Sequence, residues 1–195
     1  MSATVHLARH ASHAEVGHVL SGRSAIGLSE AGRDEAMRLG ARLAGPRLSA
    51  IHSSPRSRAC ETAAIVAERH GLPVAVNDAL DEIDFGEWTG RAFESLADDP
   101  RWQAWNAARS TTSPPEGEAM ADATARARTF IESVATDDGA ILCVTHCDII
   151  RGLAAHYLGL DPDRLLAFDC DPASLTTLAL FPGGGRVVTL NERPQ

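Results

Sequence analysis

The sequence contains no lysine, and all 18 of its basic residues are arginine. A site that binds an anion must therefore be built from arginine, histidine and backbone N–H groups. Acidic residues outnumber basic ones, 26 to 18, and the net charge is −8. A field of this sign disfavours binding to nucleic acid or to an anionic membrane.

Cysteine is scarce, and long apolar runs are missing. The four cysteines are Cys60, Cys143, Cys147 and Cys170, which is below the density of a disulfide scaffold. The start of the sequence lacks the apolar stretch of a signal peptide, and no run is long enough to cross a bilayer. We therefore expect a cytoplasmic protein with reduced thiols and no membrane partner.

The remaining composition is that of an ordinary globular protein. Hydrophobic residues make up 44% of the sequence and charged residues 23%. A length of 195 residues suits one domain with a full-sized core. No internal repeat or low-complexity linker divides the chain, so we expect a single domain over residues 1–195.

Short apolar runs alternate with helical patterns along the chain. The predicted strands are 4–8, 49–53, 73–76, 140–145, 175–180 and 186–190, and the predicted helices are 29–44, 54–70, 93–97, 101–108, 118–136 and 148–158. Ser54 is expected to cap its helix, with Pro55 in the first turn. The Pro-Gly-Gly-Gly stretch at 182–185 predicts a hairpin. The alternation indicates an α/β three-layer sandwich, with a mostly parallel central sheet flanked by helices.

Polar residues follow the ends of four of these predicted elements. Arg9-His10 follows the first strand and 53–58 the second, Asp81-Glu82 comes shortly after the third, and Thr145-His146 ends the fourth. Ligands of such sheets bind beyond the carboxyl ends of the strands. The pattern therefore brings two histidines, several arginines and a carboxylate to one edge. An Arg-His pair alone is also what a partly exposed strand end contains, so the prediction depends on this convergence.

Four short motifs occur in a fixed order along the chain. They are Leu7-Ala-Arg-His10, the stretch Ser53–Ala63 (SSPRSRACETA), the stretch Leu80–Gly90 (LDEIDFGEWTG), and Val144-Thr-His146 followed by Ile150-Arg151. Together they resemble the histidine phosphatase superfamily, in the branch that includes cofactor-dependent phosphoglycerate mutase. The resemblance runs from Leu7 to Arg151, about three quarters of the chain. It implies a phosphoglycerate-mutase-like fold with a small cap-like insertion at about residues 87–117.

The resemblance also implies a role for each matching residue. His10 would be the nucleophile that becomes phosphorylated, because an imidazole nitrogen can attack phosphorus. Arg9, Arg58 and His146 would hold the phosphoryl oxygens, since guanidinium binds them in a fork. Glu82 would be the proton donor to the leaving oxygen.

The chain departs from the family pattern around these residues. Ala11 and Cys147 stand where the family usually has glycine, and Val16 stands near the place of a missing asparagine. Both replacements for glycine are small, so we expect Cys147 to remain part of the substrate-binding surface. Ser21 and Gly22 are expected to supply backbone donors in the first loop.

Several polar residues allow competing interpretations. Asp81 and Asp84 compete with Glu82 for the role of proton donor. Metal could be considered for His13 and His18, or for the cluster of Cys143, His146 and Cys147, but these spacings fit no standard zinc site. We therefore expect neither a metal nor a cofactor.

The segment before the long helix also allows more than one interpretation. Trp88 is expected at the pocket mouth, while Trp102 and Trp105 either line it too or pack a short helix. Four arginines could contact a second anionic group of the substrate, although each is better explained as a surface charge: Arg23, Arg91, Arg101 and Arg109.

The sequence thus predicts a metal-independent phosphatase that hydrolyses a small phosphomonoester through a phosphohistidine. Phosphoryl transfer of the phosphoglycerate mutase type is a competing hypothesis, but the chain has no sizeable insertion before His146 to retain the phosphoryl group. A non-catalytic phosphate-binding module and a metallohydrolase are two more hypotheses for the same residues. Whether the chain acts alone or as a homodimer stays open.

Overall fold

The computed structural model describes residues 2–45, 47–135 and 139–193. Its strands are β1 (Ala3–Arg9), β2 (Leu48–Ser53), β3 (Val74–Val76), β4 (Ala140–Thr145), β5 (Leu175–Phe181) and β6 (Gly184–Glu192). Its α-helices are α1 (Glu30–Arg42), α2 (Ser57–His70), α3 (Phe93–Ala97), α4 (Pro100–Ala107), α5 (Met120–Val134) and α6 (Cys147–Leu158). Short 3₁₀ helices are η1 (Asp78–Leu80), η2 (Gly86–Trp88) and η3 (Pro162–Arg164).

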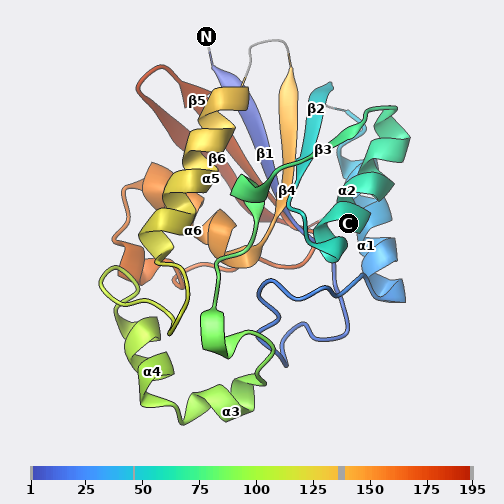
Figure 1. Cartoon of the computed structure of the whole chain (residues 1–195). Coiled ribbons are helices and arrows are strands. Elements are labelled where there is room, and N and C mark those ends of the chain that lie inside the picture. Colours follow the sequence, from blue (N-terminus) through green and yellow to red (C-terminus); the bar gives the residue numbers. More distant parts are fainter. Residues whose placement is uncertain (1, 46, 136–138, 194–195) are drawn as a thin grey trace.

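The six strands form one mixed sheet in the order β3-β2-β4-β1-β5-β6 (Figure 1). The pairs from β3 to β1 are parallel, and β5 runs antiparallel to both β1 and β6. All of β4 is buried, as its unbroken apolar sequence requires for a central strand covered on both faces. The predicted α/β fold is confirmed, as is the hairpin at 182–185, which joins β5 to β6.

Two separate cores lie on the two faces of the sheet. Leu7 of β1 and Cys143 of β4 pack with α5 and α6, whereas Ala8 and Val144 pack with α1 and α2. Successive side chains of a strand point to opposite faces, so both strands serve both cores. This gives the three layers seen in Figure 1.

One predicted helix start is wrong. Helix α2 begins at Ser57 with Arg56 as its N-cap, and no side chain caps it. Ser54 lies further back, where its hydroxyl contacts His146. Its side chain is used in a tertiary contact that the local sequence does not reveal. The last predicted residue of the long helix, Thr136, lies outside the described residues.

The loop after β1 is tied to the start of α1. Ser29 caps that helix, its Oγ accepting from the Gly32 amide at 3.1 Å, and it donates to the Ser12 carbonyl at 3.1 Å. Ser12 in turn donates through its amide and hydroxyl to Glu35. These contacts fix the chain immediately after His10.

Gly32 has no room for a side chain at this junction. A Cβ there would lie 1.9 Å from the Ser12 carbonyl oxygen, which is backbone and cannot move aside cheaply. Gly32→Ala is therefore expected to lower the free energy of unfolding by about 1–3 kcal/mol in a urea titration. Gly45→Ala is the control, because nothing lies within 4 Å of its Cβ position. Equal stability of the two variants would contradict the predicted clash.

Segment 86–117 lies beyond the carboxyl ends of β1 and β4 (Figure 1). It is joined to the first loop by backbone hydrogen bonds: Gly90 N–H donates to the Leu20 carbonyl at 2.8 Å, and Phe93 N–H donates to His18 at 2.9 Å. The two segments thus form one wall over the sheet edge.

Among the described residues, no helix combines the length and the apolar character needed to traverse a bilayer.

Candidate active site

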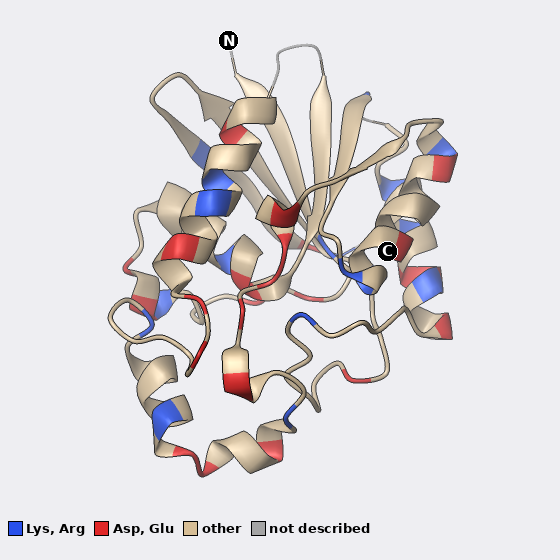
Figure 2. Ribbon diagram, in the orientation of Figure 1, with Lys and Arg blue, Asp and Glu red and all other residues tan. Residues whose placement is uncertain are grey.

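A cavity of about 450 Å³ opens at the carboxyl edge of the sheet. It is lined by seven of the residues that the sequence predicts for the site: Arg9, His10, Ser21, Gly22, Arg58, Glu82 and Cys147. His146 is the exception, because it is fully buried and lies behind Arg58. Figure 2 shows where charged residues gather at this edge. Arginine (blue) occurs at the end of β1 and at the start of α2, and acidic residues (red) occur in the stretch after η1.

His10 presents one nitrogen without a proton. Its Nδ1 lies 2.9 Å from the Ala11 carbonyl oxygen, which can only accept, so Nδ1 carries the hydrogen. Arg58 Nε donates to the His10 Nε2 at 3.1 Å, so Nε2 offers a lone pair. Burial, Arg58 and Arg9 hold the His10 pKa well below its ordinary value, which keeps the ring neutral. The arrangement suits attack on phosphorus by Nε2.

Arg58 joins the two histidines. It lies in the first turn of α2, is 2% exposed, and donates through NH2 to His146 Nδ1 at 3.2 Å. The same guanidinium donates to the carbonyls of Gly22 and Ser24. One buried cation therefore fixes both imidazoles and the first loop.

The Ser21 amide, predicted to be a backbone donor to the substrate, donates within its own loop. The Ser21 amide already donates to the Val19 carbonyl at 3.0 Å, and its hydroxyl donates to Glu15 at 2.7 Å. Gly22 contributes its carbonyl, which accepts from Arg58. The loop therefore holds the Arg58 guanidinium through backbone carbonyl oxygens. The sequence suggests backbone N–H donors in this loop and gives no sign of these acceptors.

Arg9 and Cys147 share a contact on the opposite wall. Arg9 NH1 donates to the Cys170 carbonyl at 2.6 Å, and the Cys147 thiol lies 3.8 Å from the same oxygen. A hydrogen bond with Cys170 and burial raise the Cys147 pKa well above its ordinary value. Cys147 is therefore a neutral thiol beside Arg9, and its small size leaves the cavity open.

His146 follows β4 and stands at the N-terminus of α6. Its Nδ1 accepts from Arg58, so its Nε2 carries the hydrogen and donates to Ser54 Oγ at 2.7 Å. Burial and the Arg58 cation hold its pKa well below the ordinary value. The ring is neutral, and its centroid lies 5.1 Å from that of His10.

Glu82 is a buried carboxyl group in the wall of the cavity. Thr145 at the end of β4 holds the segment in place by donating to the Leu80 carbonyl at 2.6 Å. The Glu82 Oε1 accepts from the Ile83 amide at 2.9 Å. Burial, with the nearby Asp148, raises the Glu82 pKa to about 8. The carboxyl is therefore protonated at neutral pH and can donate a proton.

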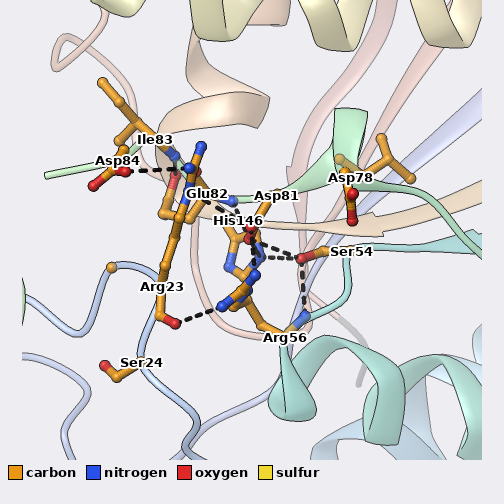
Figure 3. Close-up of polar contacts among 12 residues, drawn as sticks. Arg23, Ser24, Ser54, Arg56, Asp78, Asp81, Glu82, Ile83, Asp84 and His146 are labelled. Carbon is orange, nitrogen blue, oxygen red and sulfur yellow. Dashed lines mark hydrogen bonds and ion pairs between the residues drawn. The ribbon is translucent and has the colours of Figure 1, made fainter. Parts of the chain in front are cut away.

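The two competing carboxylates are engaged elsewhere (Figure 3). Asp81 pairs with Arg56 at 2.8 Å, and Asp84 pairs with Arg23 at 3.2 Å. Of the three acidic residues, Glu82 is the one that lines the cavity.

Sequence reasoning missed a buried ion pair in the cavity wall. Arg109, expected as a surface charge, is 5% exposed; it donates to Asp148 at 3.1 Å and stacks over Trp105 at 3.8 Å. The partners are 39 residues apart, so no local pattern indicates the pair.

Trp102 lines the cavity, whereas Trp105 and Trp88 are buried in the core, so Trp88 is not at the mouth.

His13 also lines the cavity, with its ring centroid 5.3 Å from that of His10. Burial and Arg58 lower its pKa to about 4, so it is neutral. Across the described residues, no three His, Cys, Asp or Glu side chains are grouped to hold a metal ion. A larger hollow of about 980 Å³ lies between the β5–β6 hairpin and α5 and α6, but none of the predicted site residues lines it.

Comparison with known proteins gives consistent results. The model of the histidine phosphatase superfamily (branch 1) matches residues 5–193. Phosphoserine phosphatase 1 of Hydrogenobacter thermophilus is 29% identical over 84% of this chain and 80% of its own length. Glucosyl-3-phosphoglycerate phosphatase of Mycobacterium tuberculosis is 33% identical over 74% of this chain and 70% of its own. The chain spans 48% of a bifunctional protein of the same species, with 31% identity over 87% of this chain.

Solved structures agree with this assignment. A structure named mycobacterial hydrolase 2 has a TM-score of 0.90 and 29% identity, covering 100% of this chain and 92% of its own. The native structure of mycobacterial glucosyl-3-phosphoglycerate phosphatase has a TM-score of 0.88 and 28% identity, covering 98% of this chain and 100% of its own. The chain therefore belongs to branch 1 of the histidine phosphatase superfamily and is an enzyme of the phosphatase class.

Proposed function

We propose that the protein hydrolyses small phosphomonoesters through a phosphohistidine at Nε2 of His10. The phosphoryl oxygens take over the Arg58 N–H that Nε2 accepts in the free protein. The freed lone pair of Nε2 attacks phosphorus, the P–O ester bond breaks, and the leaving oxygen takes the proton of Glu82. Water then attacks phosphorus, the P–N bond breaks, and the Glu82 carboxylate takes a proton from that water. Inorganic phosphate leaves, and both side chains return to their starting states.

The observation that carries this proposal is the fixed tautomer of His10. Its Nδ1–H is held by a carbonyl at 2.9 Å, so the nitrogen beside Arg58 is the one that can react. Arg9 and Arg58 supply the positive charge that the phosphoryl group needs during transfer. His146 holds Arg58 in place by accepting a hydrogen bond from its NH2 group. Ser21, Gly22 and Cys147 shape the surface around the phosphoryl group.

The substrate class follows from the cavity wall and from the relatives. We propose that residues 87–117 act as a cap within a single domain of residues 1–195, and that its side chains contact the leaving group. Trp102, Asn106 and Arg109 line the cavity from this segment. The relatives are named for phosphoserine and glucosyl-3-phosphoglycerate, both small phosphomonoesters, and these are the first substrates to test.

The free cysteines of the described structure support a reducing compartment, the cytoplasm.

The competing functions have less support. A non-catalytic module would not require a neutral histidine nucleophile beside a protonated carboxyl, yet His10 and Glu82 line one cavity. A mutase must keep its phosphoryl group from water, and the relatives named above are phosphatases.

The test is turnover of p-nitrophenyl phosphate, phosphoserine and glucosyl-3-phosphoglycerate in excess EDTA. We expect release of phosphate at an unchanged rate after chelation. Quenched single-turnover samples should contain a phosphoryl label that is labile in acid and stable in base. Activity lost on chelation would favour a metallohydrolase, and transfer of the label to 3-phosphoglycerate instead of water would favour a mutase.

A further inference from the structure

A chain of buried polar contacts runs from His146 to Asp81 (Figure 3). The Nε2–H of His146 donates to Ser54 Oγ at 2.7 Å, and Ser54 Oγ lies 3.4 Å from Asp81 Oδ1. His146 and Ser54 have no exposed surface, and Asp81 is 5% exposed. The three residues come from different segments, so the contact depends on the tertiary fold.

Asp81 is itself held by several groups. Its Oδ1 accepts from the Glu82 amide at 2.8 Å, and its Oδ2 pairs with Arg56 at 2.8 Å and with Arg23 at 3.5 Å. Arg56 donates in turn to the Arg23 carbonyl at 2.7 Å. Asp81 therefore presents a fixed carboxylate oxygen to Ser54.

The hydrogen atoms in this chain can be assigned from the chemistry of the groups. A carboxylate can only accept, so the single hydroxyl hydrogen of Ser54 points to Asp81. The Ser54 oxygen is then an acceptor toward His146, which requires the hydrogen on Nε2 of that ring. The second nitrogen, Nδ1, is left as the acceptor that faces Arg58.

We propose that Asp81 and Ser54 are positioning residues that fix the tautomer of His146 and, through it, the place of Arg58. The opposite tautomer would turn an N–H toward the Arg58 guanidinium, and two donors would then face one another. Arg58 would be displaced from His10 Nε2, which it contacts at 3.1 Å. The proposal rests on the proposed phosphatase function, because it explains how that site is kept in its reactive arrangement.

The simpler explanation is that Asp81 only anchors Arg23, Arg56 and the backbone of Glu82. A tautomer measurement separates the two, since an anchoring role would leave the hydrogen on His146 unmoved. Asp84→Asn is the matched control for Asp81→Asn: Asp84 pairs with the same Arg23, at 3.2 Å, and lies on the same loop. Ser54→Ala removes the intermediate oxygen, together with the hydrogen bond that it accepts from the Arg56 amide at 3.3 Å, but keeps the carboxylate of both arginine ion pairs.

The experiment records ¹H–¹⁵N spectra of histidine side chains in the free protein at pH 7.5, with His146 assigned by its loss in His146→Gln. We expect Nε2–H in the wild type and in Asp84→Asn. In Asp81→Asn the amide oxygen should pair with Arg56, which can only donate, and the NH2 group would then face Ser54, so the single Nε2–H state of His146 should be lost. With p-nitrophenyl phosphate, Asp81→Asn and Ser54→Ala should each lower kcat about ten- to a hundredfold and change KM little. The double variant should be no slower than the slower single one, because the two residues act as a unit.

Thermal melts show whether each variant is folded, and Ser54→Ala decides the question if Asp81→Asn does not fold. A wild-type His146 with its hydrogen on Nδ1 would overturn the proposal. Wild-type kcat in a folded Asp81→Asn or Ser54→Ala would overturn it as well. A wild-type protein inactive on every phosphoester would instead contradict the proposed function, while the free-protein spectra would still report the tautomer.

Discussion

His10→Ala is expected to lower kcat/KM for p-nitrophenyl phosphate by about 10⁴- to 10⁶-fold, with no acid-labile label. The magnitude follows from the loss of Nε2, the atom placed to form the covalent intermediate. The remaining cations would still bind phosphate, so the affinity for inorganic phosphate should fall much less than kcat. Single-turnover chemical quench and a phosphate-binding titration measure the two effects.

His13→Ala is the matched control for this experiment. Its ring lies 5.3 Å from that of His10, lines the same cavity and is also neutral. The two rings differ in their contact with Arg58, because Arg58 Nε donates to His10 Nε2. We expect labelling to persist in His13→Ala. Labelling that survives in His10→Ala and disappears in His13→Ala would show that His13, and not His10, is the nucleophile.

Glu82→Gln is expected to lower kcat by about 10²- to 10³-fold on phosphoserine, whose alkoxide leaving group needs a proton. The loss should be smaller on p-nitrophenyl phosphate, because nitrophenolate leaves without one. Wild-type kcat/KM, which reports ionisations of the free enzyme, should fall as pH rises through about 8, where the Glu82 carboxyl ionises. That alkaline limb should be missing in Glu82→Gln and retained in Asp84→Asn. An unchanged profile in Glu82→Gln would assign the proton donor elsewhere.

The same carboxyl predicts a stability effect of defined sign. Its pKa is raised from an ordinary 4.5 to about 8, so the folded protein favours the protonated form. This contribution to stability is complete below about pH 4.5 and is lost as pH rises toward 8. Glutamine cannot ionise, so the melting temperature of Glu82→Gln relative to wild type should be higher at pH 8.5 than at pH 5. The active site would thus retain a group that weakens the fold at alkaline pH.

Local patterns in the sequence were sufficient for the architecture and for the position of the site edge. The apolar run of β4 and the turn at 182–185 depend on neighbouring residues, and both lie where predicted. The residues after β1 and β4 meet because parallel strands end at one edge, a property of the topology. His10 and Glu82 were placed at the cavity by that argument together with the family resemblance.

The errors concern side chains whose partners are distant in sequence. Ser54 has the local features of a helix cap, yet its hydroxyl contacts His146, 92 residues away. Arg109 is of a residue type and in a sequence context typical of the surface, but it pairs with Asp148 in the cavity wall. Burial of such groups depends on long-range pairing, which neither periodicity nor spacing records.

The position of β1 has a consequence for how this enzyme loses activity. Parallel β4 lies on one side of the strand and antiparallel β5 on the other, so its backbone is hydrogen-bonded along both edges. Segments of this kind open only when the whole molecule unfolds, whereas loops and edge strands open locally. His10, the proposed nucleophile, directly follows that strand, and its amide donates to the Thr145 carbonyl at 2.9 Å, so we expect global unfolding to be needed to free its backbone. Thermal loss of activity should therefore accompany global unfolding and not a local opening at His10.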